Sequence, residues 1–216
     1  MAKFTMRIVP VLVAVLFAAT QANAQGVSAY FGLGSAFNSS ATEAGCPSGQ
    51  VVDPFAQTPA CAAVNGMGGV FGVFGADFMI KPHLGINGEY TFRFAQSDYM
   101  PSESLKVRPA FYDFNLVYQP TSGDKSVVPV VEGGIGGAKM SFYFSQSNNL
   151  FSQSLFVVSS SHFQVHGAAG VKWYFKGDAF IKPQIDLRYV PHLTDQYGRN
   201  FVPEFTVSIG YSFGRQ

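Results

Sequence analysis

The sequence predicts an all-β fold, an eight-stranded antiparallel up-and-down β-barrel. Three observations predict it: residues alternate between apolar and polar over about ten positions at a time, an export signal precedes these segments, and the connections between them alternate between short and long. The segment 84-LGINGEYTFRF-94 shows the alternation, with Tyr90 and Phe92 on one face and Glu89 and Arg93 on the other. Successive side chains of a strand point to opposite sides, so this strand would have an oily face and a polar face.

The first 24 residues have the features of a cleaved signal peptide. Lys3 and Arg7 precede the apolar run Ile8 to Ala19, and Ala22-Asn23-Ala24 forms a small-x-small cleavage site. The run is too short to span a bilayer as a helix, so we expect cleavage and not anchoring. The predicted mature domain is 25–216. Without Lys3 and Arg7 it carries 12 basic and 13 acidic residues, a formal charge of −1, which gives no indication of nucleic-acid binding.

Seven further strands follow from the same alternation. In the strand at 180–191, for example, Ile185 and Leu187 face one way while Asp186 and Arg188 face the other. The second, fourth, sixth and eighth predicted strands end in aromatic residues, namely Phe78, Tyr118, Trp173 with Phe175, and Tyr211 with Phe213. The predicted strands are 27–37, 67–79, 84–94, 109–119, 127–144, 164–175, 180–191 and 202–213.

The connections support an even-stranded membrane barrel. Short segments rich in Gly, Pro, Asp and Ser follow the second, fourth and sixth strands, at 80–83, 120–126 and 176–179. Longer polar segments follow the first, third, fifth and seventh strands, at 38–66, 96–108, 145–163 and 192–201. Outer-membrane barrels have short periplasmic turns and long extracellular loops, so this alternation predicts the direction in which the chain crosses the membrane.

The placement of charge indicates which face meets lipid. Charged residues make up only 12% of the chain, and nearly every one within a predicted strand falls on its polar face. A Lys or Arg on the lipid face would cost about 2–4 kcal/mol near the midplane. Lys139 is the exception, and its position far along its strand predicts a place near the outer interface. The predicted interior network is Asp77, Glu89, Arg93, Asp113, Glu132, Lys172, Asp186, Arg188 and Glu204.

An eight-stranded barrel has an interior just wide enough for side chains to fill. Unpaired charge there would be costly, so we expect a plugged, salt-bridged interior. A narrow, low-conductance ion path is the alternative within the membrane. A soluble barrel with the apolar face turned inward is a third interpretation, in which the charged set would coat the outside.

Cys46 and Cys61 lie in one segment rich in Gly, Pro and Ser. An exported chain meets an oxidising compartment, so we expect a local disulfide that closes this loop. A metal site would need further His or Cys ligands, which this segment lacks.

These features resemble the small outer-membrane β-barrel family, meaning the OmpA-type N-terminal barrel and related porin-family surface proteins. The export signal, hairpins such as 84–94 and the closing 205-FTVSIGYSFG-214 carry the resemblance. Tyr211 and Phe213 look like the C-terminal sorting aromatics that the barrel-assembly machinery reads, although Gly214-Arg215-Gln216 follow them. The resemblance implies the cell outer membrane, with lipid and lipopolysaccharide as surroundings, and implies no peptidoglycan-binding domain.

Catalysis and cofactors find little support. Some barrels of this size are lipid-A-modifying hydrolases with a His-x-Ser pair, and His192-x-Thr194 comes nearest here. A site could assemble from Ser159 to His162 with Asp195 or Glu103, but such Ser-rich loops are common. The segment 133-GGIGGAK-139 lacks the Gly-Lys-Ser/Thr of a phosphate loop. We therefore expect no enzyme activity, cofactor or metal.

The segment 145–163 contains Leu150, Phe151 and 155-LFVV-158. These apolar residues favour an extension of the two neighbouring strands as a hairpin beyond the bilayer, and a contact surface for a partner is the alternative. The whole sequence predicts a role in membrane integrity and surface contacts, with the loop ligand unidentified.

Overall fold

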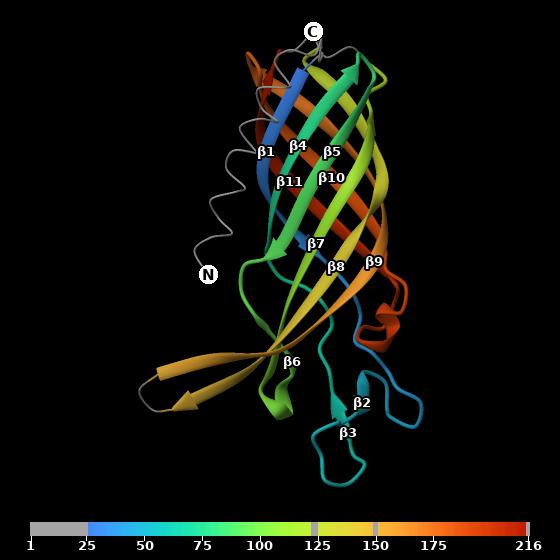
Figure 1. Ribbon diagram of the computed structural model, residues 1–216, viewed down its shortest axis with the longest axis vertical. Coiled ribbons are helices and arrows are strands. Elements are labelled where there is room, and N and C mark those ends of the chain that lie inside the picture. The colour runs from blue at the N-terminus through green and yellow to red at the C-terminus, as the bar shows by residue number, and fades with distance from the viewer. Residues whose placement is uncertain (1–25, 122–124, 149–150, 215–216) are drawn as a thin grey trace, which may run out of the picture.

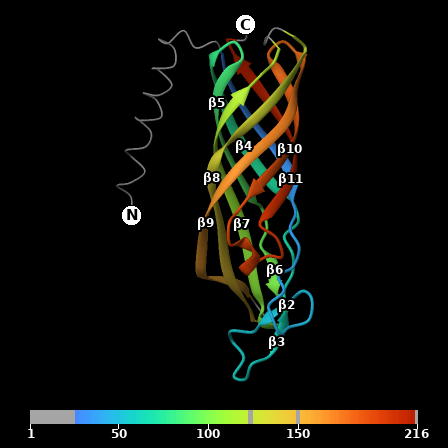
Figure 2. The ribbon, with the colours of Figure 1, turned by 90° about the vertical axis from the view of Figure 1, so that its right-hand side faces the viewer.

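A computed structural model describes residues 26–121, 125–148 and 151–214, and the expected signal peptide and its cleavage site lie outside them. The predicted all-β antiparallel fold is confirmed: eight strands form a closed ring (Figures 1 and 2). Around the ring the order is β5-β4-β1-β11-β10-β9-β8-β7, and β7 pairs again with β5. The ring strands are β1 (Gly26–Ala36), β4 (Phe71–Lys81), β5 (Leu84–Arg93), β7 (Leu105–Tyr118), β8 (Val127–Asn148), β9 (Phe151–Lys176), β10 (Ala179–Tyr189) and β11 (Phe201–Phe213).

Most strand bounds lie within a few residues of their predicted positions, but β9 begins at Phe151 and not at 164. The long connections also hold elements that the sequence did not predict: β2 (Gln50–Val52), β3 (Cys61–Ala63), β6 (Ser97–Met100) and the 3-10 turns η1 (Pro101–Glu103) and η2 (Leu193–Asp195). Within the described residues, no helix has the length and apolar character needed to cross a membrane.

The wall of the ring is apolar outside and polar inside. On the outer surface, Phe114 of β7 is 71% exposed and Ile185 of β10 is 64% exposed, whereas Asp186 and Arg188, which face the other way along β10, are fully buried. Lys139 is exposed on β8, opposite Ala110 of β7 and Ser161 of β9, toward the end of the ring with long connections. This is the polarity that the alternation predicted.

The interior has an apolar layer at each end of its polar middle. At the end with long connections, side chains from the loops and the strand ends form an apolar cluster, which we call the cap: it includes Phe71, Tyr99, Phe111, Phe142 and Tyr197. Toward the opposite end, Val128, Tyr174 and Phe180 pack together, and Met79 packs with Val117 and Val130. The charged residues therefore lie between two apolar layers.

Two glycines make room for large interior side chains. A Cβ on Gly75 would lie 2.2 Å from the Tyr30 ring, and one on Gly210 would lie 2.4 Å from the Phe180 ring. Only glycine lets these rings fill the lumen at those positions.

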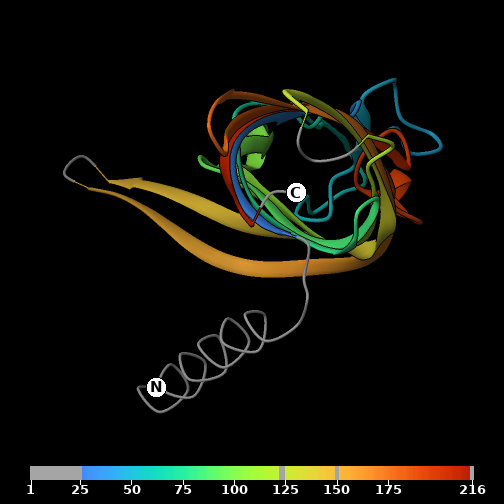
Figure 3. The same ribbon diagram turned by 90° about the horizontal axis from the view of Figure 1, so that it is seen from above.

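Strands β8 and β9 continue past their other neighbours as a two-stranded ribbon, which we define as residues 145–148 and 151–164. Pairing of β8 with β7 ends at Phe144, and pairing of β9 with β10 begins at Val165. The register of the pair shifts between Phe142 and Tyr143, which leaves Val157 as an extra residue on β9. Such a bulge bends a strand, and the ribbon turns aside from the ring axis (Figures 1 and 3). The predicted hairpin extension is confirmed.

Candidate functional site: a charged network inside the ring

Arg188 of β10 lies at the centre of the buried network. Its Nη2 lies 3.1 Å from Asp113 Oδ2 and 3.3 Å from Glu89 Oε1, and its Nη1 donates to Glu204 Oε2. The ring of Phe111 lies 5.0 Å from the guanidinium carbon. One guanidinium thus joins carboxylates from β5, β7 and β11, because its planar fork offers five donors in fixed directions.

Two lysines hold the next group of carboxylates. Lys172 Nζ lies 2.7 Å from Asp77 Oδ2, and Lys182 Nζ lies 2.5 Å from Glu132 Oε1. Tyr30 connects this group to the first, since its hydroxyl donates to Glu89 Oε2 at 2.9 Å and accepts from Lys182 Nζ at 3.3 Å. All of these side chains are buried, so each ion pair lies away from bulk water.

A chain of amides connects Asp77 to His166. Asn87 Nδ2 donates to Asp77 Oδ1 at 2.7 Å, and Asn115 Nδ2 donates to Asn87 Oδ1 at 3.1 Å. Asn115 Oδ1 lies 3.0 Å from His166 Nδ1. On the other side, Asp186 Oδ1 lies 3.0 Å from His166 Nε2.

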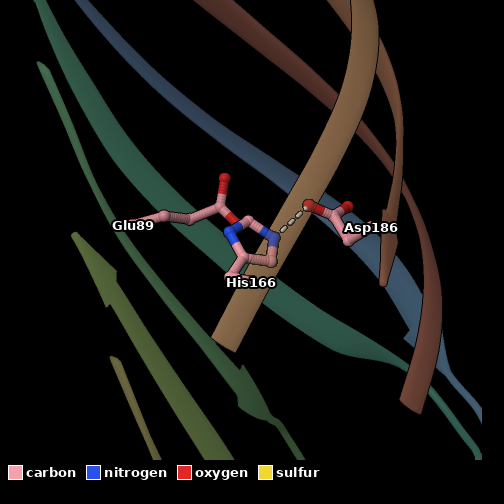
Figure 4. Close-up of side chains that lie close together, drawn as sticks. All are labelled: Glu89, His166 and Asp186. Atoms are coloured by element: carbon pink, nitrogen blue, oxygen red, sulfur yellow. Dashed lines mark hydrogen bonds and ion pairs between the residues drawn. The ribbon is translucent and has the colours of Figure 1, made fainter. Parts of the chain in front are cut away.

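Asp186 Oδ1 also accepts a hydrogen bond from Gln184 Nε2 at 2.6 Å. Figure 4 shows Glu89, His166 and Asp186 converging from three strands, with possible metal-ligating atoms within 4.8 Å of one another. Both ring nitrogens of His166 already have hydrogen-bond partners inside the network, in Asn115 and Asp186, so these contacts account for the cluster without a metal ion.

Among the described residues, the network contains more acids than bases. Six buried carboxylates share Lys172, Lys182 and Arg188, and the His166 ring lies beside two of them, Asp113 and Asp186. Buried charge without a partner is expensive, which accounts for the sharing of Arg188 by three acids. The carboxylates are Asp77, Glu89, Asp113, Glu132, Asp186 and Glu204.

The structure brings eight of the nine predicted interior residues into this network; Arg93 does not join it. Arg93 is half-buried at the end of β5 and donates to Ser97 Oγ. The prediction missed Lys182, which lies in the 180-FIKP-183 stretch next to a turn. Two-residue steps back from Asp186 and Gln184 lead to Lys182, so the alternation itself contained this signal.

The hydrolytic alternative finds no supporting geometry in the described part of the chain. His162 Nε2 is buried without a hydrogen-bond partner, and Ser160 Oγ pairs with the side chain of Gln196. Asp195 and Thr194 are exposed. No hydrogen bond therefore aligns a serine, a histidine and an acid at this end of the ring.

The predicted Cys46–Cys61 disulfide is present and joins the segment before β2 to the first residue of β3. The cap contains two phenols in edge-to-face contact: the Tyr99 ring lies 5.8 Å from the Tyr197 ring and 5.2 Å from the Phe142 ring. Burial raises the pKa of Tyr99 to about 12, and burial together with the neighbouring Tyr99 also raises the pKa of Tyr197. The cap therefore packs like the core of a water-soluble protein.

A cleft of about 640 Å³ opens between the disulfide loop and the base of the ribbon. Val51, Val52 and Phe55 line one part of it, and Phe142 and Val158 line another. Glu43 and Asp195 are its acidic residues, and no basic residue lines it.

Comparison with known proteins gives the fold its class. No protein-family model matches the chain, and no curated relative matches it. Its structure is similar to Neisserial surface protein A, with 12% identity, a TM-score of 0.55 and coverage of 87% of this chain and 97% of that one. It is also similar to the outer membrane protein OprG from Pseudomonas aeruginosa, with 11% identity, a TM-score of 0.52 and coverage of 89% of this chain and 97% of that one. A major outer membrane protein from Thermus thermophilus is similar too, with 9% identity, a TM-score of 0.51 and coverage of 86% of this chain and 99% of that one.

Two of these solved structures are outer membrane proteins and one is a surface protein, and at 9–12% identity the likeness is one of fold. The chain thus has the fold of the small outer-membrane β-barrels, the class that the sequence resembles.

Proposed function

We propose that this protein is an eight-stranded up-and-down transmembrane β-barrel of the outer membrane, with a sealed interior. It would serve membrane integrity and present a surface for contacts outside the cell. The short turns would face the periplasm and the cap and ribbon would face outward. Outer-membrane lipid and lipopolysaccharide would surround it, and the barrel-assembly machinery would insert it through the strand that ends in Tyr211 and Phe213.

The observation that carries this proposal is the inverted polarity of the ring. Apolar side chains such as Phe114, Leu116 and Ile185 are more than 60% exposed, while Asp113, Asp186 and Arg188 are at most 1% exposed. In water such a surface would be an extensive apolar patch, and in a bilayer it is the expected boundary with hydrocarbon. The aromatic residues Tyr118, Trp173, Tyr211 and Phe213 are exposed near the end with short turns, which suits an interfacial girdle.

The interior supports a structural role and gives no support to conduction. Ion pairs fill its middle, and the apolar cap and the Val128, Tyr174 and Phe180 cluster lie on either side of them. A water-filled path would need open space through both apolar layers. The cleft beside the disulfide loop supports contacts of the outer surface with other molecules.

Heat-modifiability combined with fractionation tests the proposal. Expressed with its natural leader in a Gram-negative bacterium, the chain should sediment with outer membranes. Unboiled protein should migrate faster than boiled protein on a detergent gel, because the closed ring resists the detergent. Recovery of the protein in the soluble periplasmic fraction would contradict the proposal.

Planar-bilayer recording tests whether the interior is sealed. The folded protein should give no discrete current steps. A known porin recorded under the same conditions is the positive control for the method. Steady steps from the unaltered protein would favour the pore and would overturn the sealed interior.

A further inference from the structure

Within the described ranges, β9 has a long edge that pairs with no other strand. Over residues 151–164, β9 pairs with β8 on one side and has no strand on the other, since its pairing with β10 starts at Val165. An unpaired edge offers a row of N–H and C=O groups to a further strand. The other short strands, β2, β3 and β6, have only three or four residues each.

The edge also lacks the features that normally prevent pairing. From Met140 to Val171 the sequence contains no Asp, Glu, Lys, Arg or Pro. By contrast, β6 carries Asp98 beside Lys106 and ends at Pro101. Proteins usually protect exposed edges with charge, proline or short length, and this edge has none of the three.

Its side chains favour addition of a strand. Leu155, Phe156, Val157 and Val158 are consecutive and 41–65% exposed, so both faces of the ribbon present apolar residues. Aromatic and β-branched residues have high strand propensity, and a neutral run of them is the composition that stacks with other strands. Tyr143 packs edge-on against Phe156 at 5.7 Å, which holds this part of the ribbon flat against its partner strand.

We propose that a second copy of this chain pairs with β9 at Leu155–Ser159, edge to edge and antiparallel. This inference rests on the proposed membrane insertion. All copies in one membrane stand in the same orientation, so every ribbon lies at the same height and projects sideways from its ring (Figure 3). A two-fold axis along the membrane normal would bring two such edges together, as in an isologous interface. Identical uncharged segments meet without electrostatic repulsion, which favours self-pairing over a charged partner.

Single-cysteine cross-linking tests this pairing in the full mature chain, folded in phosphatidylcholine vesicles. Val157→Cys probes the edge, because antiparallel pairing over Leu155–Ser159 places the two copies of position 157 opposite each other, within reach of a disulfide. Gln57→Cys in the exposed disulfide loop is the matched control. The native cysteines are bonded to each other and stay out of the reaction. Under mild oxidation the Val157→Cys variant should form disulfide-linked dimers, and the Gln57→Cys variant should form at least roughly tenfold fewer.

A charge variant sharpens the test. Val158→Lys, added to Val157→Cys, places like charges on both sides of the two-fold axis and should lower cross-linking by roughly tenfold. Gln57→Lys, added to the same background, should leave it unchanged. Equal cross-linking at positions 57 and 157, or no effect of Val158→Lys, would overturn the pairing.

The same samples separate other outcomes. If Phe156→Trp in a Trp173→Phe background shows blue-shifted emission that follows the lipid and not the protein density, the ribbon lies on the bilayer and the pairing is wrong. Gel mobility of each variant reports the fold of the ring independently. Variants that keep the fast-migrating form but never cross-link would refute the pairing while leaving the proposed function intact.

Discussion

The middle of the ring and the cap are built from one chain but with opposite polarity. In the ring, ion pairs such as Arg188–Asp113 lie inside and apolar residues such as Phe114 lie outside. In the cap, Phe71, Phe111 and Tyr197 lie inside and polar loop residues lie outside. Because burial of apolar surface is favourable only relative to water, each region shows which medium surrounds it. The boundary between the two patterns thus marks where we expect lipid to give way to water.

The largest effect should come from removing the central cation of the ring. Arg188→Met leaves Glu89, Asp113 and Glu204 without their shared guanidinium, and breaking a buried pair costs about 3–5 kcal/mol. Urea unfolding in vesicles, followed by gel mobility, measures the loss. Arg199→Met, at an exposed loop position, should have almost no effect. Equal stability of the two variants would show that the lumen is hydrated and not packed.

A lysine on the outer surface of the ring tests whether that surface faces hydrocarbon. Ile135, 56% exposed on β8, should lie against hydrocarbon, so Ile135→Lys should cost about 2–4 kcal/mol in vesicles. The same substitution at Gln57 in the disulfide loop should cost little. Unfolding midpoints in urea give both values. A tolerated Ile135→Lys variant would mean that water surrounds the ring.

The sequence predicted the ring well because its wall separates two media with a period of two residues. Alternation placed Asp186, Arg188 and Glu204 inside from the pattern alone. Lys182 lies on the same face of the predicted strand at 180–191, so the pattern also places it inside, although the predicted set left it out. The start of β9 was missed for a physical reason. Both faces of the ribbon lie outside the ring, so the segment 152-SQSLFVVSSS-161 shows no polar and apolar alternation.

The cap could not be predicted from periodicity. It is formed by side chains such as Ala41, Met67, Tyr99 and Leu193, which come from separate loops and short strands. Their contacts depend on where the ring places the loop ends, and no local pattern specifies that. Only the disulfide, from the oxidising compartment and the two cysteines, could be anticipated in this region.

Loss of the disulfide should loosen the region around the cap without opening the ring. In the chain-entropy model, a loop of 15 residues contributes about 3 kcal/mol as an upper value. The double variant Cys46→Ser with Cys61→Ser should therefore be cut faster by protease at the β2–β3 segment, while its heat-modifiable gel mobility stays unchanged. If the stability of the ring fell by the same amount, the cap and the ring would unfold together and would not be separate energetic units.

The smallest effect should appear at alkaline pH and only in the cap. The pKa of Tyr99 is raised to about 12 in the folded chain, against about 10 when unfolded, because burial disfavours the phenolate. Its contribution to stability is thus complete below pH 10 and is lost as pH rises toward 12, by about 2 kcal/mol in total once partial exposure to solvent is allowed for. Hydrogen exchange of cap amides should quicken over this range, and Tyr99→Phe should weaken that dependence, although the buried Tyr197 retains part of it. Exchange in the middle strands of the ring should stay slow, since the cap phenols lie at the end of the ring with long connections. If exchange of the ring amides quickened over the same pH range as exchange of the cap amides, the ring and the cap would unfold as one cooperative unit.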